Sequence, residues 1–212
     1  IRMLQAQINP HFLYNTLDSI KWIAVIQKNS GIVKAVTALS KLLKNMAKGV
    51  DERVTLREEL DFVRDYVTIE KLKYVEMFDL EVDIGEEMLY DARIVKLTLQ
   101  PLVENAFKHG FEDTPEHKRL LVSVLKRRGF LVIRIFNDGM AVPAERIARI
   151  RELLMPDNQE ETMDCFALRN LSRRLKLLFG GNSQVTLRSG NGIGTIVSLR
   201  IPLRKEGEED DD

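Results

Sequence analysis

The chain has 212 residues, of which 44% are hydrophobic and 30% are charged, a composition typical of a globular protein rather than a disordered one. Its 32 basic residues balance 32 acidic residues, and a net charge of zero argues against nucleic-acid binding, which usually shows as a basic excess. Cys165 is the only cysteine, which excludes an internal disulfide and fits a reducing cytoplasm. No apolar run approaches the roughly 18–20 residues needed to cross a bilayer.

The first 50 residues predict two amphipathic helices joined by a polar turn at residues 28–31. Apolar residues recur in steps of three and four, as in coiled-coil seams. Because two such short helices cannot enclose a core, we expect two hairpins to pair as a four-helix bundle. The alternative is a hairpin packed on its own globular domain. The two stripes consist of Leu13, Leu17, Ile20 and Ala24, then Ile32, Val36, Leu39, Leu43 and Met46.

Downstream elements follow from changes in periodicity. A capping-box pattern at residues 55–58 predicts a third helix that ends near residue 74. Leu80, Val82 and Ile84 alternate with charged residues, as on a half-buried strand. Strands in hairpins with helices between them indicate an α+β sandwich rather than a doubly wound parallel sheet. The remaining expected elements are a helix through Ile94, Leu97, Leu102 and Ala106, strands at 120–125 and 130–136, helices at 143–154 and 166–179, a polar loop at 156–164 and a hairpin at 184–203.

The stretch 7–17, Q-I-N-P-H-F-L-Y-N-T-L, contains the first candidate functional residue. Pro10 is best tolerated at the first helical position, with Asn9 as N-cap, so His11 is expected in the first turn. There the positive end of the helix dipole disfavours imidazolium, and a neutral imidazole is what a nucleophile at phosphorus requires. From these residues alone, a helix-capping segment with an incidental histidine is the alternative.

This stretch resembles the phosphoacceptor box of the autolysin-sensor (LytS-like) family of histidine kinases, in which an N-P-H-F-L-Y-N segment accepts the phosphoryl group. The resemblance implies that His11 is the phosphorylated residue. It also implies a membrane-anchored parent protein, with a transmembrane or sensor region preceding this sequence and the present chain in the cytoplasm. No catalytic base is evident beside His11, since Phe12 follows it and Asp18 lies two turns away.

A second motif, L-Q-P-L-V-E-N-A-F-K-H-G, occupies residues 99–110. On a helix, Asn105, Lys108 and His109 would share one face. An amide oxygen suits Mg²⁺ and a cation suits phosphate, although such residues taken alone usually form a solvated face. The motif resembles the N box of the GHKL (Bergerat) ATP-binding fold shared by histidine kinases, gyrase and Hsp90. The resemblance implies Asn105 as the magnesium ligand and Lys108 or His109 as phosphate contacts.

The segment G-N-G-I-G-T at residues 190–195 leads into the last expected strand. Taken alone, it is a glycine-rich hairpin turn. In the fold that the N box resembles, the matching Gly192, Gly194 and Thr195 lie near the nucleotide and the lid. The position of this segment after the N box favours the functional interpretation.

The adenine-binding segment departs from the family pattern. The usual aspartate is replaced by Asn137, which is followed by Asp138 and Gly139. An amide oxygen at Asn137 can still accept a hydrogen bond from adenine, but without the strength that a charge gives. In a strand, Asp138 would point to the opposite face of the sheet.

The lid segment is the second departure, because the usual G-x-G-L-x-N reads C-F-A-L-R-N at residues 165–170. Leu168 and Asn170 are retained, whereas Cys165 and Ala167 replace glycines. If both positions require a positive φ, each replacement costs roughly 1–2 kcal/mol. We therefore expect this chain to bind ATP more weakly than relatives with the full glycine pattern.

Together these features predict an α+β chain with four parts. Residues 1–50 form dimerisation and histidine phosphotransfer helices, 51–77 a connecting helix, 78–204 a GHKL ATP-binding domain and 205–212 an acidic disordered tail. The expected function is that of a two-component sensor histidine kinase, which uses ATP and Mg²⁺ to phosphorylate His11 and passes the group to an aspartate of a response-regulator receiver domain. The alternative is a homodimeric signalling module with a degraded nucleotide pocket. A GHKL ATPase that performs conformational work has no need of a phosphoacceptor box.

Overall fold

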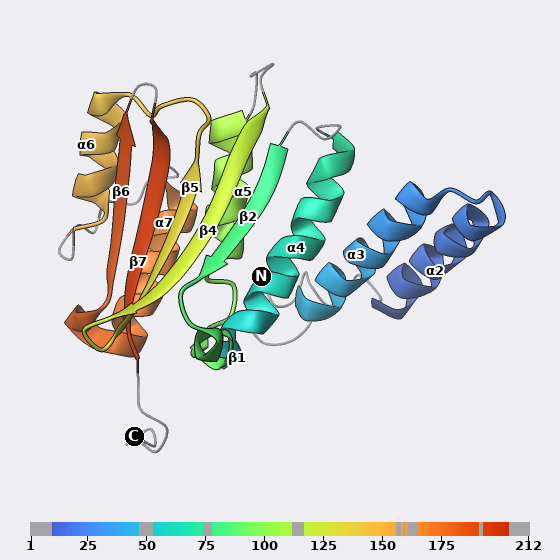
Figure 1. Ribbon diagram of the computed structural model, residues 1–212, viewed down its shortest axis with the longest axis horizontal. Helices are drawn as coiled ribbons and strands as arrows, with labels where there is room; N and C mark the ends of the chain where they lie inside the picture. The colour runs from blue at the N-terminus through green and yellow to red at the C-terminus, as the bar shows by residue number, and fades with distance from the viewer. Residues whose placement is uncertain are drawn as a thin grey trace.

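A helical hairpin lies at one end of the molecule (Figure 1). The computed structural model describes residues 10–46, 53–73, 78–111, 117–155, 158, 160, 165–190 and 193–203. The hairpin consists of α2 (Pro10–Ile26) and α3 (Ser30–Met46), as the sequence predicts. The Asn29 side chain caps α3, because its Oδ1 accepts a hydrogen bond from the amide of Ile32 at 3.1 Å.

The hairpin buries only part of its apolar surface. Ala24, Val36, Ala38 and Leu42 are buried, and α3 packs against both α2 and the following helix. Other apolar residues of α2 remain open to solvent, with Trp22 67% and Ile26 77% exposed. Ile20, Ile23, Ile32 and Leu39 are exposed as well. The hairpin thus packs on its own domain through α3 and keeps an uncovered apolar face.

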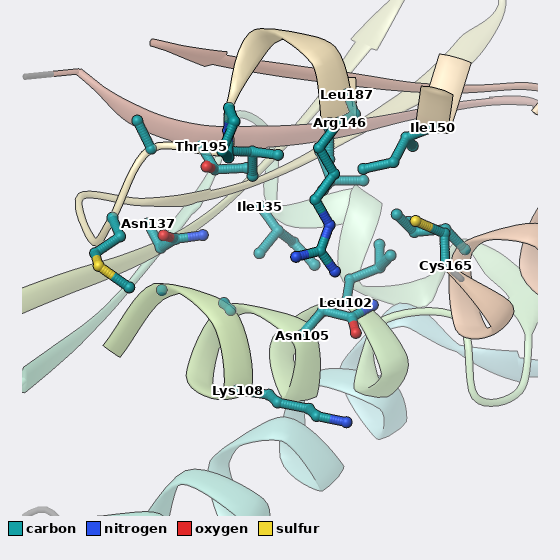
Figure 2. A pocket seen from close by; sticks show the side chains of 18 residues that line it. Leu102, Asn105, Lys108, Ile135, Asn137, Arg146, Ile150, Cys165, Leu187 and Thr195 are labelled. Atoms are coloured by element: carbon teal, nitrogen blue, oxygen red, sulfur yellow. The ribbon is translucent and has the colours of Figure 1, made fainter. Parts of the chain in front are cut away.

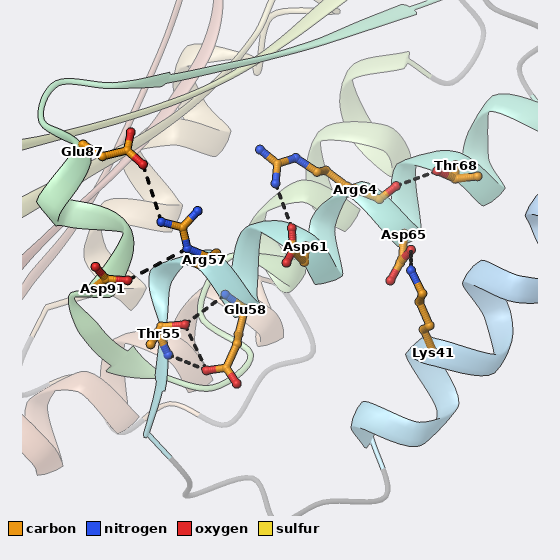
Figure 3. A network of polar contacts seen from close by, with 10 residues as sticks. All are labelled: Lys41, Thr55, Arg57, Glu58, Asp61, Arg64, Asp65, Thr68, Glu87 and Asp91. Atoms are coloured by element: carbon orange, nitrogen blue, oxygen red, sulfur yellow. Dashed lines mark hydrogen bonds and ion pairs between the residues drawn. The ribbon is translucent and has the colours of Figure 1, made fainter.

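The helix α4 (Leu56–Lys73) begins at the predicted capping box (Figure 3). The amide of Glu58 donates to Thr55 Oγ1 at 3.2 Å, and the amide of Thr55 donates to Glu58 Oε2 at 2.8 Å. Reciprocal bonds of this kind satisfy backbone donors that a helix start otherwise leaves unpaired. The apolar face of α4, formed by Leu56, Leu60, Val63 and Val67, is buried in the hydrophobic core beneath the sheet.

A five-stranded mixed sheet in the order β2-β4-β5-β7-β6 forms the second layer. β2 pairs parallel with β4 at one edge, and the other neighbours are antiparallel. One face of the sheet is buried against α4 to α7, as the burial of Val122, Ile133 and Leu199 shows. This arrangement confirms the predicted α+β sandwich. The strands are β2 (Phe78–Ile84), β4 (Lys118–Arg127), β5 (Phe130–Asn137), β6 (Gln184–Gly190) and β7 (Gly194–Pro202).

The later helices also lie where the sequence predicts them. They are α6 (Ala144–Leu153) and α7 (Phe166–Phe179). Gly180, with φ +61°, follows α7 and begins the short 3₁₀ segment η3 (Gly180–Asn182). None of the helices in the described ranges has the length and apolar character that a bilayer crossing requires. Most of the predicted loop at 156–164 and the predicted tail at 205–212 lie outside the described residues.

The predicted helix through Ile94 is wrong at its start. Residues 93–95 form strand β3 (Arg93–Val95), which pairs with β1 (Arg53–Thr55), and a 3₁₀ segment η1 (Glu87–Asp91) precedes it. The helix α5 begins only at Gln100 (Gln100–Ala106) and continues as the π-helical turn η2 (Phe107–Phe111). Ile94 and Leu102 are both apolar and buried, but they belong to different elements, so their spacing resembles one helix face without being one.

Candidate functional site

A cavity of about 440 Å³ lies between α5, the inner face of the sheet and α6 (Figure 2). Its lining is mainly apolar, with side chains such as Leu102, Ile135 and Ile150. Its polar lining residues come from five different elements and are Asn105, Lys108, Asn137, Arg146 and Thr195. Apolar walls with a few convergent polar groups are typical of small-molecule and cofactor sites.

The N-box motif supplies one wall of the cavity. Asn105 on α5 and Lys108 on η2 are both lining residues, as their spacing predicts. Lys108 is exposed to solvent, and its side chain extends on the side of the helix away from Asn137 and Thr195 (Figure 2). His109 belongs to η2, but its side chain lies outside the described residues. The π-helical turn lies within the motif, and such turns occur frequently at functional sites.

The segment from Asn137 to Met140 lies against the end of the N box, in part through main-chain atoms. The amide of Met140 donates to the carbonyl oxygen of Gly110 at 3.1 Å. A Cβ on Gly139 would lie 1.9 Å from that oxygen, so only glycine fits. Gly194 has φ +92°, and a Cβ there would lie 2.1 Å from the carbonyl oxygen of Asn137. The segments around Gly110, Gly139 and Gly194 therefore pack closely at this end of the cavity, and glycine is required at the contacts.

The two residues before Gly139 differ in their surroundings, and Asp138 lies just after the end of β5. Asn137 is 5% exposed, and its Oδ1 has no hydrogen-bond partner. Because β5 and β7 align Asn137 with Thr195, both side chains lie on the face that lines the cavity. Asp138 instead accepts a hydrogen bond through Oδ1 from the amide of Arg119 at 2.6 Å. Of these two residues, only Asn137 lines the cavity.

The lid motif keeps its leucine in the cavity wall. Leu168 is buried and lines the cavity, whereas Asn170 is exposed and is not a lining residue. Cys165 also lines the cavity and adopts a left-handed conformation with φ +55° and ψ +27°. Ala167 lies inside α7 with an ordinary helical backbone. The expected strain therefore applies to Cys165 alone, at roughly 1–2 kcal/mol.

Two contributions to the site have no signal in the sequence motifs: Arg146 lines the cavity, and Ser189 contacts the lining residue Thr195 without lining the cavity itself. Arg146 on α6 extends into the cavity toward the side occupied by Asn105 (Figure 2). Ser189 Oγ lies 2.8 Å from Thr195 Oγ1 and accepts a hydrogen bond from the amide of Val142 at 2.9 Å. Neither residue belongs to a recognisable motif. For Arg146, the one sequence feature that could have indicated a role is its place in the first turn of an amphipathic helix.

The phosphoacceptor motif lies far from the cavity. α2 begins at Pro10, as predicted, and His11 follows in its first turn. The side chain of His11 lies outside the described residues, as do Asn9 and Gly192. α2 lies beyond α3 and α4 when viewed from the cavity (Figure 1). The arrangement therefore does not bring His11 to the N box within one chain.

Two family models match successive parts of the chain. The histidine kinase model matches residues 1–78. The model described as histidine kinase-, DNA gyrase B-, and HSP90-like ATPase matches residues 90–205, more than half of the chain.

Curated relatives extend this similarity over almost the whole sequence. Sensor histidine kinase YesM of Bacillus subtilis (strain 168) is 34% identical over 206 residues, which are 97% of this chain and 34% of YesM. Sensor protein LytS of Staphylococcus saprophyticus is 31% identical over 210 residues, which are 99% of this chain and 34% of LytS. The chain thus spans about a third of the length of these curated relatives.

Solved structures show the same fold. The histidine kinase domain of the blue-light activated histidine kinase from Erythrobacter litoralis EL346 aligns with a TM-score of 0.50 at 17% identity, covering 92% of this chain and 94% of that one. The catalytic domain of histidine kinase ThkA aligns with a TM-score of 0.50 at 15% identity, covering 72% of this chain and 97% of that one. Sequence and fold agree, and the chain belongs to the histidine kinase-, DNA gyrase B- and HSP90-like ATPase family, with a histidine kinase region in front of its ATPase domain.

Proposed function

We propose that this chain is the catalytic part of a sensor histidine kinase, which uses Mg-ATP to phosphorylate His11. The observation that carries the proposal is the cavity lined by Asn105, Lys108 and Asn137, each at its motif position. This geometry gives no support to the alternative of a degraded pocket, because the cavity is open. Of the two residues that replace lid glycines, only Cys165 has a strained backbone.

The adenine end of the nucleotide would lie against Asn137. Its buried Oδ1 lacks a donor, and the amino group of adenine would supply one. Gly139 and Gly194 pack against the carbonyl oxygens of Gly110 and Asn137, which fixes the main chain at this end of the cavity. Thr195 lies beside Asn137 on the same face. Asp138 is assigned to support of the β4 backbone rather than to adenine, because it is bonded to the amide of Arg119.

The phosphate end would lie toward the N box and the lid. The Asn105 side-chain oxygen suits Mg²⁺, which prefers oxygen ligands and keeps several waters. Lys108, together with His109, would face the phosphates as cations or donors, and Gly192, Leu168 and Asn170 would border them. When bound, Mg²⁺ supplies positive charge that offsets charge developing on the transferred phosphoryl group.

His11 is proposed as the acceptor. One nitrogen of its neutral imidazole forms a bond to the γ-phosphorus, while the bond between that phosphorus and the departing oxygen of ADP breaks. Because α2 lies beyond α3 and α4, the reaction requires either the cavity of a second copy or movement of the ATPase domain relative to the hairpin. A response-regulator aspartate is then the proposed acceptor from His11, and a membrane-anchored parent is proposed for the cytoplasmic part described here.

The nucleotide assignment predicts how Asn105→Ala behaves in calorimetry. ATP affinity in Mg²⁺ should fall by about tenfold or more, because a metal ligand is lost. Adenosine affinity should stay unchanged, because Asn137 and the glycine-lined end are intact. In EDTA the variant and the unaltered chain should bind ATP alike.

Asn182→Ala serves as the control for that experiment, because Asn182 is exposed on η3 and does not line the cavity. Equal Mg-ATP affinity in Asn105→Ala and the unaltered chain would contradict the metal-ligand assignment. Failure of the unaltered chain to bind ATP at all would contradict the proposed function itself.

Dimerisation is the second expected result, since the uncovered face of α2 carries Trp22, Ile23 and Ile26 in contact with solvent. Light scattering at tens of micromolar should give twice the mass of the chain, and Ile23→Glu should shift the mass toward one copy. Thermal unfolding should be little affected by Ile23→Glu at low concentration, because the residue is 55% exposed in one copy. A single-copy mass for the unaltered chain would count against the four-helix bundle.

A further inference from the structure

The turn between β3 and the N-box helix is held by two side chains from other elements and by its own Lys96, which bonds to the main chain of α3. Residues 96–99 connect β3 to α5, and Leu97 in this turn has φ +59°, a conformation that a β- or γ-branched residue rarely adopts unaided. The turn immediately precedes the helix that carries Asn105. Its position therefore determines where the N box begins.

The carboxylate of Glu59 on α4 binds three consecutive amides of this turn. The amide of Leu97 donates to Oε1 at 2.6 Å, and the amides of Thr98 and Leu99 donate to Oε2 at 2.9 Å each. Leu99 is the N-cap residue of α5, and Leu97 and Thr98 precede it, so Glu59 fixes the three residues that lead into the helix. Burial raises the pKa of Glu59, against the opposing effects of the three amides and Arg174.

The lid helix contacts the same turn. Arg174 on α7 donates through Nη2 to the carbonyl oxygen of Leu97 at 2.9 Å, and its charge interacts with that of Glu59. The peptide between Leu97 and Thr98 therefore bonds to α7 through its carbonyl oxygen and to α4 through its amide. This peptide lies just before the N-box helix. Leu168, one of the cavity-lining residues, lies two turns before Arg174 on the same helix.

The hairpin reaches the turn as well. Lys96 is 5% exposed, and its Nζ donates to the carbonyl oxygen of Asn45, near the end of α3, at 2.5 Å. A polar cavity of about 550 Å³ lies between α3 and α4 beside Lys96 and Glu59, although the two helices also pack together. The pair Lys41 and Asp65, at 3.4 Å, joins the same two helices and is largely solvent-exposed on the lysine side (Figure 3). The Lys96 bond thus connects the end of α3 directly to the turn.

We propose that Glu59 and Arg174 are positioning residues that hold the N box for nucleotide binding, and that Lys96 connects the same turn to the phosphotransfer hairpin. This inference rests on the proposed function, because it assigns consequences to nucleotide binding at Asn105. The two carboxylate oxygens of Glu59 accept all three amides of the turn, a pattern that an amide side chain with one acceptor oxygen does not reproduce. The three side chains thus have separable effects on binding and on phosphotransfer.

The inference predicts different kinetic changes for the two kinds of contact. Arg174→Met should raise the Kd and KM for Mg-ATP by about tenfold, the effect of losing one charge-assisted hydrogen bond, and leave adenosine binding within about twofold. Arg174→Lys, which retains a donor and the charge, should restore most of the affinity. Lys96→Met should leave the Kd for Mg-ATP unchanged but lower the rate of autophosphorylation at saturating ATP.

Glu59→Gln tests the same turn from α4. An amide has one acceptor oxygen and places an N–H against a backbone N–H, so Mg-ATP affinity should fall by at least as much as in Arg174→Met. If Glu59→Gln does not fold, the comparison of Arg174→Met with Arg174→Lys, together with Lys96→Met, tests the positioning role instead. Ile201→Ala, a core change at the far end of β7, is the control for lost stability, because Ile201 is buried but does not line the cavity.

The outcomes separate the inference from the proposed function. Mg-ATP binding by the unaltered chain tests the proposed function alone. The positioning role is overturned if the unaltered chain binds Mg-ATP and Arg174→Met binds it equally well. It is also overturned if Arg174→Met loses no more affinity than Ile201→Ala at matched thermal stability. A loss of ATP affinity in Lys96→Met would overturn the separate role of the hairpin contact.

Discussion

His11→Gln is expected to reduce the incorporation of phosphate from γ-labelled ATP to the background of the assay. Glutamine keeps a polar side chain of similar length but has no nitrogen lone pair that can attack phosphorus. The affinity for Mg-ATP should stay within about twofold, because α2 lies away from the nucleotide cavity and contributes no lining residue. The label on the unaltered chain should be labile in acid and stable in alkali, as expected for phosphohistidine.

The matched control is His117→Gln. The His117 ring lies 2.9 Å from Asp79, is exposed to solvent and does not line the cavity. This variant should incorporate label at the normal rate. Undiminished label in His11→Gln would reject the acceptor assignment, and loss of label in His117→Gln alone would transfer it to His117.

Gly139→Ala should both destabilise the chain and abolish nucleotide binding. The added Cβ would lie 1.9 Å from the carbonyl oxygen of Gly110, a main-chain atom that cannot move without shifting the end of the N box. Forced overpacking of this kind costs about 3 kcal/mol or more, and thermal unfolding should begin roughly 6–12 °C lower for a chain of this size. Both changes can be followed by calorimetry, with and without Mg-ATP.

Gly181→Ala is the control for the alanine substitution itself. A Cβ on Gly181 has no heavy atom within 4 Å, and its φ is not in the positive range. The melting temperature and the ATP affinity of this variant should match those of the unaltered chain. A Gly139→Ala variant with normal stability and normal affinity would show that the close contact between the two motifs is not required.

Most secondary structure followed from periodicity because the elements are amphipathic. The alternation in β2 and the three-and-four spacing in α4 and α7 each reflect one buried face, and the fold class follows from their order. The start of α5 could not be predicted in this way. Its boundary depends on Glu59, a residue nearly 40 positions earlier, whose carboxylate satisfies the amides of residues 97–99.

The site was predictable where function is carried by short motifs. Asn105, Lys108 and Asn137 line one cavity because their segments have fixed places in the fold. Strand alternation does not account for Asp138, because β5 ends at Asn137 and the Asp138 carboxylate bonds to the backbone of β4. Arg146 and Ser189 could not be found, because their contribution depends on how α6 and β6 pack against elements distant in sequence. The strain expected at Ala167 was likewise absent because the backbone there is already helical.

The meeting of Gly110, Gly139 and Gly194 also has a consequence for folding. Their segments are separated by tens of residues, so this wall has a high contact order and forms only after β5 has paired with β7. The local β4–β5 hairpin or the helical hairpin can form earlier without it. Nucleotide therefore recognises only the completed domain, and by mass action it draws late intermediates toward the native state. Synthesis in the presence of abundant ATP would favour complete molecules over partly folded ones.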